Sequence, residues 1–371
     1  MTQDLASVQE AIEAFRTGKI VVVTDDDDRE NEGDLFIAAS QCTPQRMAFL
    51  VRHTSGIVCA PLTTQEARRL RLDPMVALND APLGTAFTVS VDCRHGLTTG
   101  ISAEERTNTV RALANPNSGP TDFVRPGHVF PLVARDGGVL MRSGHTEACV
   151  DLCRLAGLPQ VGVLAELVND DGTVKRGPEV RAFAEAHGLR MLTIAELIAY
   201  RQRRERLVER VASFEVRTAF GPAQGYAYRT PFDPMQHLAL AFGEVANNGP
   251  VLVRLHRESV LADVFGPSRT LERAMKRIAR ERGVLVYLRD GSAGVPPVSL
   301  AAQTHEPASR TDEGHNSAQA RAAQWREVGL GAQILRDLGV RSIRLLASRS
   351  RHYVGLQGFG IEIAETVILE G

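Results

Sequence analysis

The 371-residue sequence has no excess of charge of either sign. It contains 43 Lys and Arg against 44 Asp and Glu, which gives a formal net charge of −1. A nearly neutral chain has no overall positive field with which to hold a polyanion. Aromatic residues are also scarce, at 5%, and the one Arg-rich segment, residues 201–210, has no stacking platform beside it. Nucleic acid is therefore not an expected partner.

Long apolar runs are missing as well. No window approaches the roughly 18 consecutive apolar residues of a membrane-spanning helix. The first residues, MTQDLASVQEAIEAF, carry acids in place of the basic and apolar regions of a signal peptide. We expect a cytoplasmic protein that does not bind membranes.

Cysteine is rare and unevenly placed. The five cysteines are Cys42, Cys59, Cys93, Cys149 and Cys153. An odd number confined to one half of the chain is not the pattern of a disulfide framework. The helical spacing of Cys149 and Cys153 is only a weak metal signal, so both are interpreted as small apolar residues on a helix face.

The apolar content, 43%, is enough for two cores at this chain length. Helical spacing over residues 5–17 leads into the β-branched run 20–23, and similar alternations follow, which predicts a mixed α/β fold. We expect two domains, 1–206 and 207–371, each a mixed sheet flanked by helices. Residues 193–210 are predicted to form a solvated connecting helix. The predicted strands of the second half are Val251–His256, Val284–Leu288, Ile343–Leu346 and Ile361–Ile368, with a mobile loop over Gly291–Asn316.

A dense run of carboxylates, DDDDRENEGD at residues 25–34, directly follows the first predicted strand. Ends of strands are where sites collect in sheet proteins, and so many like charges repel one another unless a cation binds. Mg²⁺ is a suitable cation because it prefers carboxylate, water and substrate oxygens. Arg29 within the run offers a fixed positive group for an anionic substrate.

A second candidate element is GGVLMRSGHTEACVDLCRLAG at residues 137–157. It is interpreted as a short apolar strand, a turn at Ser143 and Gly144, and a helix that begins near Thr146. Such a turn presents backbone N–H groups and the positive end of a helix to an anion. Arg142 adds charge, and His145 can bind a metal or carry a proton.

Both elements resemble the signatures of the 3,4-dihydroxy-2-butanone 4-phosphate synthase family, as do RHTSGIVCAPLT and GLTTGISAEERTNTVRAL. The family commonly has Glu where this chain has Asp27. The resemblance implies a lyase of riboflavin biosynthesis that converts D-ribulose 5-phosphate into 3,4-dihydroxy-2-butanone 4-phosphate and formate. It also implies a homodimer and two Mg²⁺ or Mn²⁺ ions per site, held by Glu30 and His145.

The same resemblance implies a set of substrate contacts and three residues with catalytic roles. The substrate contacts are Arg29, Glu30, Asp34, Arg142, Ser143, Gly144, His145, Thr146 and Glu166. The catalytic residues are His128, Glu166 and Asp34, with His128 expected on a loop, RPGHVFP, made rigid by two prolines. Weaker candidates that line the site are Cys59, Thr98, Thr99 and Thr107.

From about Ser213 the chain resembles GTP cyclohydrolase II, in stretches such as VLVRLHRES, RGVLVYLR and HYVGLQGFGIEI. That family holds a catalytic Zn²⁺ with three cysteines. This chain has Ser259 at the first position, and in the region of the other two it has either Thr270 and Glu272 or a short deletion. Hydroxyls do not replace thiolates on zinc, so we expect no zinc and an inactive second domain with a structural or regulatory role.

Two alternatives remain open at this point. One is a bifunctional enzyme that carries both activities, against which the missing cysteines argue. The other is a non-catalytic nucleotide-binding protein derived from such an enzyme, against which the intact motifs of the first half argue.

Overall fold

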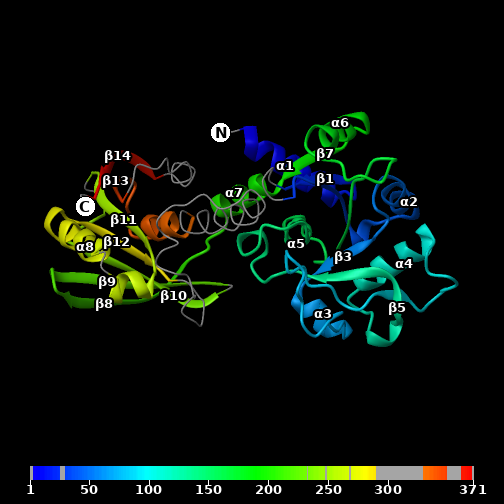
Figure 1. Ribbon diagram of the computed structural model, residues 1–371, viewed down its shortest axis with the longest axis horizontal. Helices are drawn as coiled ribbons and strands as arrows, with labels where there is room; N and C mark the ends of the chain where they lie inside the picture. Colours follow the sequence, from blue (N-terminus) through cyan, green and yellow to red (C-terminus); the bar gives the residue numbers. More distant parts are fainter. Residues whose placement is uncertain are drawn as a thin grey trace. The chain divides into compact units, whose positions relative to one another are not determined.

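The protein, seen here as a computed structural model, divides into two compact units, Met1–Tyr200 and Arg201–Gly371 (Figure 1). The structure describes residues 3–25, 30–231, 233–246, 249–266, 269–289, 329–348 and 361–369. The division falls within helix α7 (Ile194–Arg204). The domain boundary predicted from the sequence, between residues 206 and 207, lies just beyond this helix.

The first unit is built on a seven-stranded mixed sheet with the order β4-β5-β3-β6-β2-β1-β7. Its strands are β1 (Val21–Thr24), β2 (Gly33–Ala38), β3 (Cys59–Leu62), β4 (Val91–Cys93), β5 (Phe123–Val133), β6 (Gly162–Glu166) and β7 (Arg190–Thr193). Strand β2 is antiparallel to both of its neighbours, β1 and β6. Strands β1 and β6 therefore run in the same direction and end at the same rim of the sheet.

Helices cover both faces of this sheet. The α-helices are α1 (Gln3–Arg16), α2 (Pro44–His53), α3 (Thr64–Leu70), α4 (Ala103–Leu113), α5 (His145–Leu155), α6 (Pro178–Ala186) and α7, and the 3₁₀ helices are η1 (Ala39–Gln41), η2 (Pro120–Asp122) and η3 (Gly138–Leu140). Helices α2, α3, α4 and α6 contribute to one buried cluster, and α1, α5 and α7 contribute to the other.

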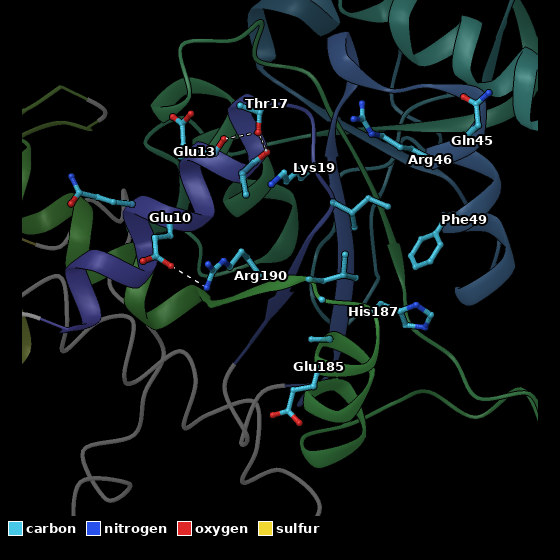
Figure 2. A pocket seen from close by; sticks show the side chains of 16 residues that line it. Glu10, Glu13, Thr17, Lys19, Gln45, Arg46, Phe49, Glu185, His187 and Arg190 are labelled. Atoms are coloured by element: carbon cyan, nitrogen blue, oxygen red, sulfur yellow. Dashed lines mark hydrogen bonds and ion pairs between the residues drawn. The ribbon is translucent and has the colours of Figure 1, made fainter.

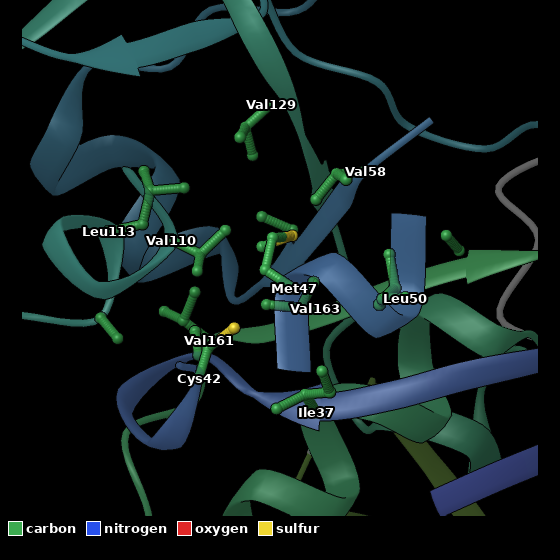
Figure 3. Packing of buried hydrophobic residues seen from close by; sticks show 14 of the residues in the cluster. Ile37, Cys42, Met47, Leu50, Val58, Val110, Leu113, Val129, Val161 and Val163 are labelled. Atoms are coloured by element: carbon green, nitrogen blue, oxygen red, sulfur yellow. The ribbon is translucent and has the colours of Figure 1, made fainter. Parts of the chain in front are cut away.

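The alternation of side chains along each strand explains how one sheet contributes to two cores. Val22 belongs to the cluster under α2, whereas Val21 and Val23 belong to the cluster under α5. Successive side chains of a strand point to opposite faces, so a continuous apolar run is what a strand covered on both faces requires. Figure 3 shows the first cluster, with Met47 of α2 and Val110 of α4 over the sheet.

The second unit has a seven-stranded sheet of its own, with the order β14-β13-β11-β12-β10-β9-β8. Its strands are β8 (Glu209–Thr218), β9 (Gly221–Thr230), β10 (Asp233–Phe242), β11 (Val251–Arg257), β12 (Gly283–Leu288), β13 (Ser342–Ala347) and β14 (Glu362–Ile368). The described helices are the π-helix η4 (Leu261–Phe265), α8 (Thr270–Glu281) and residues 329–337. Ala274 and Ile278 of α8 pack against the sheet in a separate core.

The predicted fold class, two mixed sheets flanked by helices, is confirmed. The four strands predicted in the second half are present with small shifts of their ends. Cys149 and Cys153 lie buried on α5, as expected. The loop predicted over residues 291–316 lies outside the described residues.

Two predictions of secondary structure are wrong. Residues 138–140 form the 3₁₀ helix η3 and not a strand. The predicted connecting helix ends at Arg204, and β8 begins at Glu209. That helix is not fully solvated either, since Arg201 is 2% exposed and its guanidinium lies 2.8 Å from Glu205.

No helix among the described residues is long and apolar enough to cross a membrane.

Candidate metal and substrate site

The predicted acidic residues gather where β1, β2 and β6 meet at one rim of the first sheet. Asp34, near the start of β2, lies directly opposite Glu166, the last residue of β6. Residues directly opposite in antiparallel strands point to the same face. Both side chains therefore lie on the face that α5 covers, and Glu166 shares a rim with the acidic loop.

Asp25 shapes the end of the acidic loop. Its two carboxylate oxygens accept hydrogen bonds from the backbone nitrogens of Glu30, at 3.0 Å, and Glu32, at 2.9 Å. Between them Asn31 adopts a left-handed conformation, with φ of 53°. The backbone thus turns tightly around the Asp25 carboxylate, which is 6% exposed. Residues 26–29, including the predicted substrate contact Arg29, lie outside the described residues.

Asp25, Glu30 and His145 form a group that could hold a cation. One ligand atom from each lies within 4.8 Å of the others, and the Glu30 carboxylate is 3.9 Å from Nδ1 of His145. The His145 ring also packs edge-on against Phe36, with centroids 6.1 Å apart. The two residues predicted as metal ligands are therefore neighbours, although 115 positions separate them. Asp25, the third candidate ligand and the second oxygen donor, was not singled out from the sequence.

The donor set fits a hard divalent cation. Carboxylate oxygens suit Mg²⁺ and Mn²⁺, and an imidazole nitrogen is better tolerated by Mn²⁺. Asp34 is an independent observation that fits a nearby cation. It is 2% exposed, and its Oδ1 has no hydrogen-bond partner among the residues that the structure describes. Burial, reinforced by Glu166 and Glu30, raises the pKa of Asp34 well above its usual value.

Two other acids at this rim, Glu32 and Glu166, are also affected by their surroundings. Burial, with the nearby charge of Glu30, raises the pKa of Glu32. The Ser55 hydroxyl donates a 2.8 Å hydrogen bond to Glu166, and the Ser55 backbone nitrogen donates to the Glu166 carbonyl. Glu166 is thereby fixed from both its side chain and its main chain.

The predicted phosphate turn lies at the start of α5. Helix α5 begins at His145, and Gly144 is its N-cap, in an extended conformation and without a side-chain cap. The first N–H groups of an α-helix have no partner within the helix and favour an anion. Thr146 is 5% exposed in this first turn. The turn is thus built as the sequence predicted, one residue earlier than expected.

His128 is in a different setting from the one predicted. It lies within strand β5, not on a loop. Its Nδ1 is 2.7 Å from Oδ2 of Asp92, and its backbone nitrogen donates to Oδ1 of Asp92. Gly100 closes over the pair, because a Cβ at this position would lie 2.2 Å from Asp92 Oδ2. The described contacts of His128 therefore run to Asp92 and not to the acidic group.

The weaker candidates are engaged in structural contacts. Glu105 accepts hydrogen bonds from the backbone nitrogen and hydroxyl of Thr98 and lies 3.5 Å from the hydroxyl of Thr99. The Thr107 hydroxyl bonds to the Ala103 carbonyl within α4. Cys59 is buried in β3, where desolvation raises the pKa of its thiol.

A pocket of about 1110 Å³ lies at the opposite end of β1 and β7 (Figure 2). Its lining includes Lys19, just before β1, and Arg190, the first residue of β7, which lies 3.0 Å from Glu10. Because β1 and β7 are parallel, this pocket is at the far rim from the acidic group. It is not part of the candidate site.

Comparison with known proteins agrees with this geometry. The family model of 3,4-dihydroxy-2-butanone 4-phosphate synthase matches residues 9–200. The chain belongs to the 3,4-dihydroxy-2-butanone 4-phosphate synthase family. It is accordingly a member of an enzyme family of riboflavin biosynthesis. A second model, that of GTP cyclohydrolase II, matches residues 209–368.

One curated relative of this synthase family member is the bifunctional riboflavin biosynthesis protein RIBA 1, chloroplastic, of Arabidopsis thaliana. It is 47% identical over 99% of this chain and 70% of its own length.

Two solved structures of the synthase family are also similar. RibBX from A. baumannii, described as a two-domain 3,4-dihydroxy-2-butanone 4-phosphate synthase, is 39% identical, with a TM-score of 0.82, over 98% of this chain and 99% of its own. A synthase in complex with two magnesium ions is 48% identical, with a TM-score of 0.52, over 53% of this chain and 97% of its own.

Proposed function

We propose that the first unit converts D-ribulose 5-phosphate into 3,4-dihydroxy-2-butanone 4-phosphate and formate. The observation that carries the proposal is the convergence of Asp25, Glu30 and His145 beside the start of α5. A cation site next to a helix N-terminus suits a substrate that has oxygens to chelate at one end and a phosphate at the other. Family membership supports the same reaction.

We propose Glu30 and His145 as the metal ligands, with Asp25 beside them. The resemblance and the magnesium-bound relative support Mg²⁺, with two ions per site, and the imidazole makes Mn²⁺ an alternative. When bound, the metal would polarise substrate oxygens and lower the cost of negative charge that develops next to a carbonyl.

The chain's own groups bind the substrate and move protons. We assign the phosphate to Arg142, Ser143, Gly144 and Thr146, together with Arg29. Asp34 and Glu166 lie on the same face of the sheet, where a buried carboxyl of raised pKa can hold a proton while the Ser55-bonded carboxylate accepts one. We assign them proton transfer or the orientation of substrate hydroxyls, and we assign His128 a further catalytic role.

Formate release tests this proposal. Purified protein is incubated with ribulose 5-phosphate and Mg²⁺, then Mn²⁺, and again with a chelator, and formate is measured. We expect formate with either metal and none with the chelator. Formate that is equally abundant in the chelated sample would contradict the metal site, and no formate under any condition would contradict the reaction.

A second candidate function is GTP cyclohydrolase II activity in the second unit. The family match to residues 209–368 and the name of the bifunctional relative favour it. The chain's own residues favour the inactive alternative. No cysteine follows Cys153, and the Ser259 hydroxyl accepts a 3.4 Å hydrogen bond from the Ala262 nitrogen at the start of η4. Glu272 lies on α8, 3.7 Å from Arg269.

Incubation with GTP separates these two proposals. The protein is supplied with GTP and Zn²⁺, and formate and the pyrimidine product are followed while zinc is measured in the purified protein. Turnover with about one bound zinc per chain would establish the bifunctional enzyme. No turnover and no retained zinc would support a second domain with a structural or regulatory role. In that case, titration with nucleotides would test the nucleotide-binding alternative.

The family resemblance further supports a homodimer, and we propose one in the cytoplasm. Light scattering coupled to gel filtration measures the mass of the particle directly, and a monomer of 40.3 kDa at working concentrations would contradict the dimer.

A further inference from the structure

Arg142 is bonded to protein groups on two sides of the phosphate turn. Its Nη1 donates a 2.6 Å hydrogen bond to Oε2 of Glu147. Its Nη2 donates to the Leu83 carbonyl, at 3.2 Å, and to the Thr85 hydroxyl, at 3.1 Å. A planar guanidinium can make these bonds at the same time because its donors point in fixed, different directions. Arg142 therefore ties the segment 83–85 to the first turn of α5.

Glu147 is the buried end of this tie. It is 1% exposed, and its Oε1 accepts a 2.9 Å hydrogen bond from the Arg135 nitrogen. Both carboxylate oxygens are thus used, one by the main chain before η3 and one by Arg142. A buried carboxylate is costly unless it is paired and hydrogen-bonded. Glu147 and Arg142 meet that requirement for each other.

The Arg142–Glu147 pair passes directly over Gly144. A Cβ built on Gly144 would lie 2.3 Å from Nη1 of Arg142 and 2.8 Å from Oε2 of Glu147. The φ of Gly144 is −114°, which any residue can adopt. A side chain at position 144 would therefore displace the Arg142–Glu147 pair, although the backbone conformation would accept it.

The pairing also changes how the phosphate turn attracts an anion. The Glu147 charge in the first turn of α5 would repel a phosphate, but the Arg142 charge 2.6 Å away cancels it. The backbone N–H groups of residues 145–147 and the helix dipole then remain as the anion-attracting elements, supplemented by the donors of Arg142 that the tie leaves unused.

We propose that Glu147 is a positioning residue for the phosphate end of the substrate. It acts through Arg142, which it holds as a tie between the turn 142–146 and the segment 83–85. The inference rests on the proposed function, since it assumes that the phosphate binds at this turn. It predicts that the geometry of the Arg142 fork, and not its positive charge alone, determines substrate affinity.

Three variants test this tie. Glu147→Gln keeps the shape of the acceptor but removes its charge, Arg142→Lys keeps the charge but not the fork, and Thr85→Val removes the acceptor at the far end. For each, KM for ribulose 5-phosphate and kcat are measured by formate release. We expect KM to rise about tenfold in Glu147→Gln and Arg142→Lys, as for other orienting partners, and less in Thr85→Val. We expect kcat to change less than KM.

Hydrogen exchange supplies a readout that does not depend on activity. We expect faster amide exchange over residues 79–88 in all three variants, because the tie to α5 is lost. Glu66→Gln is the matched control, since Glu66 lies 2.5 Å from Arg69, whose guanidinium bonds to the carbonyls of Asn115 and Pro116. That control should keep wild-type KM and unchanged exchange over residues 79–88.

The exchange rates and the KM values decide whether Glu147 and Arg142 form this tie. Unchanged exchange over 79–88 in Glu147→Gln, or a wild-type KM in Arg142→Lys, would overturn the tie. If Glu147→Gln fails to fold, Arg142→Lys and Thr85→Val still decide the question by the same two measurements. If the wild-type protein releases no formate, the proposed function fails, while the exchange data still test whether Glu147 fixes the segment.

Discussion

Asp92 holds His128 through both of its carboxylate oxygens: Oδ1 accepts a 2.9 Å hydrogen bond from the His128 backbone nitrogen, and Oδ2 lies 2.7 Å from Nδ1 of the His128 imidazole. The side chain of Asp92 is 4% exposed, whereas that of His128 is 42% exposed. The carboxylate therefore fixes both the position and the ring orientation of a histidine whose side chain remains partly exposed. This arrangement suits the catalytic role that we propose for His128.

Asp92→Asn should lower kcat for formate release roughly 10- to 100-fold, the usual effect of removing a partner that orients a functional histidine. The KM should change little, because no substrate contact is assigned to this pair. Asp122→Asn is the matched control, since Asp122 lies 2.9 Å from His95, a histidine whose side chain is 73% exposed. Equal losses in both variants would show that the Asp92 effect is not specific to His128.

Glu30→Gln should abolish metal binding while leaving the fold intact. The Glu30 oxygen is part of the group with Asp25 and His145, and a neutral amide is a poorer ligand for a hard cation than a carboxylate. We expect formate release to fall at least about 100-fold. Electron paramagnetic resonance with Mn²⁺ measures binding directly, and circular dichroism checks folding. Unchanged Mn²⁺ affinity would remove Glu30 from the ligand set.

Asp34→Asn should stabilise the metal-free protein at neutral pH and reduce turnover. The folded state raises the pKa of Asp34, so between the unfolded value of about 3.9 and the folded value the native state binds more protons. Stability then falls as pH rises through this window. The gain in unfolding free energy of Asp34→Asn over wild type should grow from pH 4 upward and level off above the folded pKa.

Urea unfolding in the presence of a chelator measures this difference at each pH. Glu179→Gln, at an exposed position on α6, is a control that should show no comparable rise. A constant difference between Asp34→Asn and wild type from pH 4 to pH 8 would mean that the carboxyl is not perturbed by its burial.

Gln333→Leu should destabilise the second unit by roughly 1–3 kcal/mol, the usual cost of leaving buried polar groups without partners. The Gln333 side chain accepts a 2.6 Å hydrogen bond from the Leu207 nitrogen and donates to the carbonyls of Gln202 and Glu205. Gln224→Leu, which loses one exposed hydrogen bond to Phe214, should change stability by less than about 0.5 kcal/mol. Denaturant unfolding of the full chain compares the two variants.

Local sequence patterns predicted those helices and strands whose own residues show a helical or strand periodicity. The apolar run at β1, the helix α1 and the strands β11 to β14 all follow from periodicity. Strand β8 was missed because its residues are largely exposed, and its Arg and Glu residues resemble a solvated helix. Its structure depends on pairing with β9, a tertiary contact that overrides local preference.

The candidate site was also predicted only in part, because some of its contacts depend on tertiary structure. Motifs indicated Glu30, His145 and Glu166, but the partners that hold the site were not evident. Asp92 is 36 residues from His128 in the chain, and only the pairing of β4 with β5 brings them together. Glu147 lay inside the RSGHTE motif but was not singled out from the sequence. A signal was available, because a first-turn acid five residues after an Arg is in reach of it.

The roles that we propose for Asp34 and Glu166 also make the rate of formate release a measure of strand alignment, because the two residues are paired across β2 and β6. Side chains alternate along β2, so a shift of one residue against β6 would move Asp34 to the face under α2 and α6. The same shift would place an apolar side chain beside Glu166, on the face that α5 covers. A misaligned molecule could keep its helical content and much of its compactness and still be inert. Specific activity per mole of compact protein would then count the correctly registered molecules in a refolded or freshly expressed sample.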